Sequence, residues 1–297
     1  MIDKTQNTAP CNKNKRRSIS AEVWRRLRKN KGAMIGLVIA VLLILMAITA
    51  PLLLDYKTDV INQNISERLQ SPSLAHPFGT DETGRDIMNR IIYGSRYSLS
   101  VGFIAVTVSL LIGVPLGSIA GFYGGRLDNF IMRLADVFLS IPTFLLALVV
   151  VAAIGQSTFN LMLAVGVTSA PSFIRVTRAS VLTARNQDYV EAARAIGVGD
   201  LKIIFRHVLP NSLSPIIVQA TMRVGSAIIT ASTLSFLGMG VSPPTPEWGA
   251  MLSGGRKFIR DYSYMTLFPG MAIMITVLAL NMFGDGLRDA IDPRLKR

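Results

Sequence analysis

Cysteine, histidine and charged residues are all scarce in this chain of 297 residues. The single cysteine, Cys11, cannot form an internal disulfide. It forms no metal-binding cluster with the two histidines, His76 and His207. No glycine precedes a lysine, so the Gly-x4-Gly-Lys-Ser/Thr loop that holds phosphates is missing, and we expect no ATP hydrolysis by this chain alone. No nucleophile, base and orienting acid share one element, which argues against an enzyme, although an active site assembled from distant residues stays an alternative.

Apolar residues make up 50% of the chain and charged residues only 16%, a balance that favours a membrane protein. A transmembrane helix needs about 20 mostly apolar residues. Runs of at least that length lie at 33–54, 98–126, 137–174, 208–246 (interrupted by Arg223) and 262–284. The run 137–174 is long enough for two passes, with a turn at Gly155-Gln156-Ser157. The sequence therefore predicts an all-α membrane protein with six transmembrane helices.

The basic residues lie mainly on one predicted side of the membrane. The two ends of the chain, a short loop at Arg126 and Arg133, and the segment 175–210 together hold 22 of the 31 Lys and Arg residues. Because basic residues accumulate on the cytoplasmic side, both termini and this segment are predicted to be cytoplasmic. The same bias, together with attraction to anionic lipid headgroups, explains the net charge of +13 without nucleic-acid binding.

These features divide the chain into five parts. They are a cytoplasmic basic tail (1–32), a first transmembrane helix (33–54), an extracytoplasmic loop (55–96), a five-helix core (97–287) with a cytoplasmic loop at 175–211, and a cytoplasmic C-terminal tail (288–297). In the basic tail, "SAEVWRRLRKNKG" predicts a helix on the inner membrane surface, with an unstructured flank as the alternative. The run 33–54 is longer than the apolar part of a signal peptide, so a retained anchor is favoured over a cleaved signal.

Several residues within the predicted core and its loops invite specific interpretations. Gly113, Gly117 and Gly121 lie at intervals of four and so form one stripe, which favours close helix packing within the chain over contact with another subunit. Arg223 falls near the middle of its span, where an ionisable side chain is costly. It is a candidate for the translocation path, with an internal ion pair or snorkelling as alternatives. Trp248 is predicted at a membrane interface.

The stretch "EAARAIGVGD" at 191–200 is short, charged and rich in alanine, between two apolar segments. Asn186 or Asp188 is predicted to cap a first short helix that ends at Gly197. Gly199-Asp200 then turns the chain into a second helix, which runs to Pro210. Four of its residues are predicted to share one face, namely Leu201, Ile204, Phe205 and Val208. Small residues at the bend would let a partner approach the backbone closely.

These residues resemble the EAA loop found in membrane subunits of ATP-driven importers. The matching positions, at the family's spacing, are Glu191, Ala192, Ala193, Gly197, Leu209 and Pro210. His207 stands where the pattern has an aliphatic residue. Three further stretches, "HPFGTDETGRD", "SFLGMGVSPPTPEWGAML" and "MFGDGLRDAIDPRLK", are similar to the C-type permease subunits of the branch that imports dipeptides, oligopeptides or nickel.

The resemblance implies the permease fold of a type I ABC importer in the bacterial inner membrane. It also implies a sister permease subunit, two ATPase subunits that hold ATP and Mg, an extracytoplasmic solute-binding protein, and no cofactor in this chain. Site residues on the loop would be those named above together with Gly199, Leu201 and Phe205. The implied cargo is a peptide, with nickel or a metal chelate as the alternative. From other classes, a secondary transporter or channel and a structural membrane protein stay open.

Overall fold

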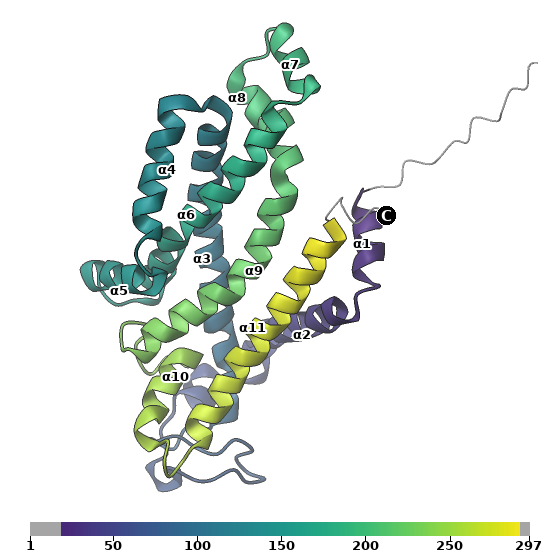
Figure 1. Cartoon of the computed structure of the whole chain (residues 1–297). Coiled ribbons are helices and arrows are strands. Elements are labelled where there is room, and N and C mark those ends of the chain that lie inside the picture. Colours follow the sequence, from purple (N-terminus) through teal and green to yellow (C-terminus); the bar gives the residue numbers. More distant parts are fainter. Residues whose placement is uncertain (1–18, 292–297) are drawn as a thin grey trace, which may run out of the picture.

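The structure is a computed structural model that describes residues 19–291, and this part of the chain is almost entirely helical (Figure 1). The segments 1–18, with Cys11, and 292–297, which belong to the two predicted tails, lie outside the described residues. Five helices are long and apolar enough to cross a membrane: α2 (Lys31–Leu53), α3 (Ile87–Tyr123), α6 (Thr158–Arg185), α9 (Leu209–Phe236, continuous with the short helices before it) and α11 (Tyr264–Ile291). The predicted all-α membrane fold is therefore confirmed.

One of the six predicted spans, the first of the two within 137–174, is formed by a bent pair of helices. Helix α4 (Gly125–Leu139) and helix α5 (Thr143–Ile154) meet at 90° across Ser140–Pro142. Proline has no N–H to donate and disfavours helical geometry in the residue before it, so this bend follows from Pro142. The twelve residues of α5 span only about 18 Å, too short for a full pass. The two passes predicted within 137–174 are thus not two straight helices, because α5 completes a span only together with α4.

The predicted break at Gly155-Gln156-Ser157 is confirmed. Gly155 ends α5 with φ of +91°, a conformation that favours glycine. Ser157 begins α6 by accepting a hydrogen bond from the backbone N–H of Asn160 at 3.0 Å. These two residues supply the C-terminal and N-terminal signals that a helix break needs.

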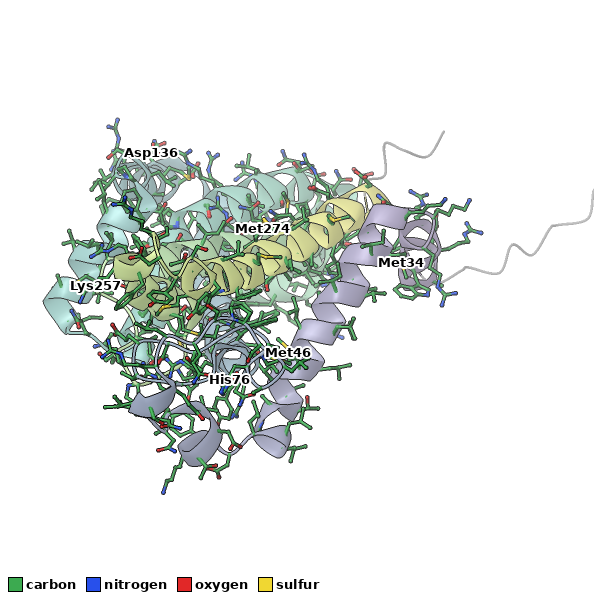
Figure 2. The ribbon with its side chains drawn as sticks, turned by 90° about the horizontal axis from the view of Figure 1, so that it is seen from below. Met34, Met46, His76, Asp136, Lys257 and Met274 are labelled. Carbon is green, nitrogen blue, oxygen red and sulfur yellow. The ribbon has the colours of Figure 1, made fainter. Side chains whose placement is uncertain are left out.

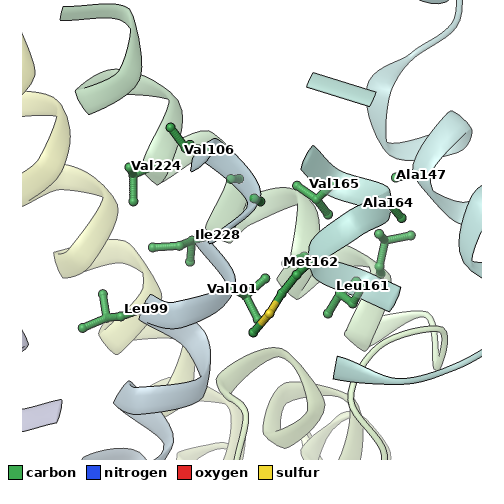
Figure 3. Packing of buried hydrophobic residues seen from close by; sticks show 14 of the residues in the cluster. Leu99, Val101, Val106, Ala147, Leu161, Met162, Ala164, Val165, Val224 and Ile228 are labelled. Carbon is green, nitrogen blue, oxygen red and sulfur yellow. The ribbon is translucent and has the colours of Figure 1, made fainter. Parts of the chain in front are cut away.

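The centre of the molecule is an apolar core shared by α3, α6 and α9 (Figure 3). Val101 of α3, Val165 of α6 and Ile228 of α9 are at most 1% exposed. Such positions contribute about 1.5–3 kcal/mol each when a side chain of this size is fully removed from water. In a membrane the corresponding gain comes from packing, because lipid is as apolar as the core.

Helices α3 and α6 approach each other closely along the stripe of Gly113, Gly117 and Gly121. A Cβ atom added at Gly117 would lie 2.6 Å from the carbonyl oxygen of Ile174, and one added at Gly121 would lie 2.8 Å from that of Arg178. All three glycines are buried against α6. The stripe therefore faces a helix of the same chain.

Helix α2 lies at one side of the molecule, packed against α11 and α3 (Figure 2). Before it, α1 (Ile19–Leu27) is the helix predicted in the basic tail. Its side chains Val23 and Leu27 pack against the end of α11, near Leu287. The predicted helix is therefore present, and these two side chains contact protein.

The segment 55–96, predicted as an extracytoplasmic loop, is partly helical. It contains a π-helical turn at Tyr56–Val60 and a 3₁₀ turn at Ile65–Glu67. Asp86 then caps α3, accepting a hydrogen bond from the backbone N–H of Asn89 at 2.8 Å. Helix α3 therefore begins at Ile87, inside the segment predicted as a loop up to residue 96.

Candidate functional site

The candidate site is the loop between α6 and α9, at the end of the molecule farthest from α10 (Trp248–Gly255) (Figure 1). It contains α7 (Asp188–Ala195), α8 (Asp200–Ile203) and a π-helical turn at Ile204–Val208. The last two continue directly into α9. The loop is thus joined at both ends to long spans of the bundle.

The inner side of the loop is a small apolar core of its own. Val190 and Ala193 of α7 are buried together with Ile203, and they pack with Phe122 at the end of α3 and Val181 of α6. Each of these side chains is at most 6% exposed. The loop is therefore a folded unit that rests on the ends of α3 and α6.

The outer side of the loop exposes three large apolar side chains. Ile196 is 80% exposed, Leu201 63% and Phe205 61%. Glu191 and Ala192 are exposed beside them. Exposed apolar side chains gathered at one place are typical of a protein interaction surface.

The predicted apolar face of the second helix is divided by the structure. Leu201 and Phe205 point outward, whereas Ile204 and Val208 are at most 2% exposed and belong to the inner core. Ile204 and Val208 are therefore not available to a partner, although the sequence predicted that they share one face with Leu201 and Phe205. A π-helical turn contains more residues per turn than an α-helix, so it rotates the following side chains away from the 3.6-residue pattern.

The two glycines of the loop differ in backbone conformation. Gly197 has φ of +80°, and a Cβ atom added there would meet no atom within 4 Å. Gly199 has φ of −64° and is equally open. Within this chain glycine is required at 197 by backbone conformation alone, since left-handed geometry costs other residues about 1–2 kcal/mol.

The start of α7 differs in detail from the prediction. Its N-cap is Gln187, without a side-chain capping bond, and Asp188 is the first helical residue. In the described part of the chain, the carboxylate of Glu191 makes no hydrogen bond or ion pair. Asp188 and Glu191 both lie in the first turn of α7, where their negative charges interact favourably with the positive end of the helix dipole. At the other end of the loop, Leu209 and Pro210 begin α9, where a missing N–H is tolerated.

Arg185 and Arg194 connect the loop to α3, and neither role was predicted. Arg185 Nη1 donates to the backbone carbonyls of Gly121 and Phe122, both at 3.0 Å, and so satisfies the C-terminal end of α3. The guanidinium of Arg194 lies 5.0 Å from the centre of the Phe122 ring. The position of Arg185 at the end of a long helix is the sequence signal for its contact with backbone carbonyls. The carbonyl of Phe122 that it binds lies 63 residues away in the chain.

An ion pair between α6 and α4 also holds this end of the bundle together. Arg178 of α6 donates from Nη2 to Oδ2 of Asp128 on α4 at 2.6 Å, with its Nε bonded to the other carboxylate oxygen. Such two-point contacts fix orientation as well as distance. Helices α3, α4 and α6 therefore support the loop as one body.

Trp248 lies elsewhere than the sequence predicted. It is fully buried, and its indole N–H donates to the carbonyl oxygen of Ile91 at 3.0 Å. Glu247 caps α10 by accepting from the backbone N–H groups of Gly249 and Ala250. Burial raises the pKa of the Glu247 carboxyl, although these bonds oppose the shift. Trp248 is therefore a packing residue at the end of the bundle opposite the loop between α6 and α9.

The fold and the loop together define a multi-span membrane subunit of a transport system, and comparison with known proteins agrees. The family described as "Binding-protein-dependent transport system inner membrane component" matches residues 113–297. The family "N-terminal TM domain of oligopeptide transport permease C" matches residues 18–72. The chain therefore belongs to the binding-protein-dependent inner membrane components, and among them to the C-type permease subunits of bacterial ABC importers.

Three curated relatives are similar over nearly their whole length. The dipeptide transport system permease protein DppC of Alkalihalophilus pseudofirmus is 50% identical over 93% of this chain and 90% of its own. DppC of Haemophilus influenzae is 45% identical over 93% and 95%. The glutathione transport system permease protein GsiD of Pectobacterium atrosepticum is 45% identical over 93% and 91%.

A solved structure shows the same fold. An inward-facing conformation of the MetNI methionine ABC transporter superposes with a TM-score of 0.58 at 18% identity, covering 69% of this chain and 98% of that one. The predicted type I importer permease fold is thereby confirmed.

Proposed function

We propose that this chain is one of two sister permease subunits of an importer that carries dipeptides or other short peptides into the cell. The cargo is inferred from the relatives, which are named for dipeptide and glutathione transport. The observation that carries the mechanism is the exposed apolar surface of Ile196, Leu201 and Phe205 on a firmly held loop. An ATPase subunit docks on this surface.

The contacts of the loop explain how docking moves the membrane helices. Arg185 and Arg194 attach it to α3, the buried core attaches it to α6, and α8 runs directly into α9. A displacement of the docked surface is therefore transmitted to three spans at once. When the ATPase pair closes around nucleotide, it favours one of two arrangements of the membrane helices, and hydrolysis restores the other.

The division of labour between subunits follows from the proposal. ATP and Mg are held by the two ATPase subunits, and this chain holds no cofactor. A solute-binding protein delivers the peptide to the outer side, while both termini and the loop 175–211 lie in the cytoplasm. Arg223, partly exposed halfway along α9, lines the translocation path. Glu191 orients the docking helix by a polar contact to the ATPase, and Gly199 lets that subunit approach the backbone.

The test is purification of the tagged chain in mild detergent, coexpressed with the neighbouring transporter subunits, with the bound ATPase measured by mass spectrometry. Wild type should carry ATPase subunits, and Gly197→Val should lose them, because a β-branched residue strains the backbone at φ of +80°. Gly199→Ala is the matched control and should retain them, since its φ of −64° suits any residue.

A second variant separates docking from folding. Phe205→Ala removes an exposed side chain and should leave the fold intact, yet weaken ATPase binding by about 1–2 kcal/mol or more if Phe205 is an anchor of the interface. If the wild-type chain carries no ATPase although all subunits are present and folded, the importer mechanism is wrong and a secondary transporter becomes the better hypothesis.

A further inference from the structure

One face of α9 is polar over much of its length. Gln219, Arg223, Ser226, Thr230 and Thr233 follow one another at intervals of four, three, four and three residues, and therefore share one side of the helix. Ser226 is exposed and the other four are partly exposed. We call these five residues the polar stripe, and it extends for about 21 Å along the helix axis.

Helix α2 shows what a lipid-facing side looks like in this protein. Its exposed side chains are large and apolar: Ile35, Val38, Val41, Leu42, Ile44, Leu45, Ile48, Leu52 and Leu53. Between Gly32 and Leu53 its one polar side chain is Thr49. A continuous row of five polar side chains on α9 therefore differs in kind from the lipid-facing surface of the same bundle.

The polar stripe is incompletely satisfied by the chain itself. Across residues 19–291, the side chains of Gln219, Arg223 and Ser226 have no hydrogen-bond or ionic partner. Thr230 and Thr233 donate to the backbone carbonyls of Ser226 and Ile229, at 3.0 and 2.8 Å, so each hydroxyl still has a free acceptor position. A polar group without a partner costs several kcal/mol in hydrocarbon, so this face requires water or a polar ligand.

Two other sides of α9 are covered by neighbouring helices. Ile228 packs against Gly102 of α3, where an added Cβ would lie 2.6 Å from Ile228 Cγ1. On another side Gly225 lies next to Val277 of α11. The polar stripe is therefore on a side of the helix that neighbouring helices of this chain leave open.

We propose that the polar stripe forms one wall of the solute passage and hydrogen-bonds the main chain of the transported peptide, an inference that rests on the proposed importer function. The hydroxyls of Ser226, Thr230 and Thr233 accept from peptide N–H groups, and the Gln219 amide both donates and accepts. Arg223, at the centre of α9, binds the peptide carboxylate.

The composition of the polar stripe also argues for the class of cargo. It contains no carboxylate and no imidazole, which are the side chains that hold divalent cations such as nickel. Neutral hydroxyls and an amide match groups that every peptide has, so recognition here is independent of the peptide's side chains. Contacts of this strength hold a solute weakly enough to let it pass on.

The polar stripe lies on one continuous helix, Asp200–Phe236, with the part of the loop that carries Leu201 and Phe205. A movement of the loop therefore moves the stripe with it. This continuity explains how nucleotide binding at one end changes which side of the membrane the wall of the passage faces.

The first test measures water access in the assembled transporter. In a Cys11→Ser background, single cysteines replace Ser226 or Thr230, with Leu42→Cys as the lipid-facing control and Ile228→Cys as the buried control. The probe is a membrane-impermeant, positively charged methanethiosulfonate in right-side-out vesicles. We expect modification at 226 and 230 to be about tenfold faster than at either control, because the thiolate that reacts requires water. Equal rates at all four sites would overturn the proposal.

The second test removes one hydroxyl without changing side-chain volume. Thr230→Val should lower uptake of labelled alanyl-alanine about fivefold, the effect of one lost hydrogen bond. Thr49→Val on α2 is the matched control, because Thr49 makes the same bond to the helix backbone, at 2.9 Å to the carbonyl of Leu45. Uptake by Thr49→Val should equal wild type, and unchanged uptake by Thr230→Val would contradict a role in the passage.

The outcomes separate this inference from the proposed function. If the cysteine variants take up alanyl-alanine before modification but are labelled slowly at 226 and 230, peptide import is supported. The role of the polar stripe as a wall of the passage is then refuted. Fast labelling of the cysteine variants at 226 and 230, with no peptide uptake by the wild-type complex, supports the passage and refutes the peptide cargo.

Discussion

The close contact between α3 and α6 makes a quantitative prediction for Gly117. An alanine there would place its Cβ 2.6 Å from the Ile174 carbonyl oxygen and 2.7 Å from Thr177 Cβ, whereas ordinary contacts begin near 3.4 Å. Helices α3 and α6 would have to separate by up to roughly 0.8 Å at this point, which loosens a close-packed interior.

Two opposing terms set the size of the effect. Overpacking of this kind costs about 1–3 kcal/mol. Replacing glycine by alanine inside a helix returns about 0.5–1 kcal/mol through backbone entropy. The packing term is the larger at its central value, so Gly117→Ala should lower the free energy of unfolding by about 1 kcal/mol, within limits of about 0 and 2.5 kcal/mol.

The assay is denaturant-induced unfolding of the assembled transporter in detergent, with Gly254→Ala as the control. Gly254 lies in α10, and a Cβ added there would meet no atom within 4 Å. The control should therefore be as stable as wild type or more stable. If Gly117→Ala is no less stable than Gly254→Ala, the close approach of α3 and α6 is wrong and the reasoning fails.

Two further predictions concern the ends of the bundle. Arg185→Met should detach the loop from α3 and lower peptide uptake, because a charged donor to two carbonyls contributes about 1.5–3 kcal/mol. Hydrogen exchange of α7 is the measurement, and unchanged protection would contradict it. At the outer end, burial alone would raise the pKa of Asp81, but the charges of Arg85 and Arg90 and two backbone donors lower it overall. The resulting stabilisation is present at neutral pH and is lost as the pH falls below about 4. Proteolysis of the outer segment should therefore accelerate in acid, and Asp81→Asn should abolish that dependence.

Part of the fold was predictable because membranes impose simple rules on sequence. A span must be long and apolar, so the positions of α2, α3, α9 and α11 followed from hydropathy. Gly155 and Ser157 marked a helix break through their own backbone and capping preferences. The bend at Pro142 was harder to predict, since proline also occurs within continuous helices here, as at Pro115 and Pro171.

The candidate site was predictable in position but only partly in orientation. The spacing of Glu191, Gly197 and Pro210 located the loop. The π-helical turn at Ile204–Val208 has no clear sequence signal, and it decides that Phe205 is exposed while Ile204 is buried. The periodicity of an ideal α-helix therefore assigned part of that face to the wrong side.

The sequence by itself determined the class of protein, the approximate spans and the position of the loop proposed to contact a partner, because hydropathy, capping and glycine spacing act over a few residues. The tertiary structure alone decided the contacts between residues far apart in the chain. Arg185 reaches the end of α3, Trp248 is buried against Ile91, and the polar residues of α9 are left on an open side. Which side of a helix is covered depends on how neighbouring helices cross it, and that geometry is fixed only when the whole bundle packs.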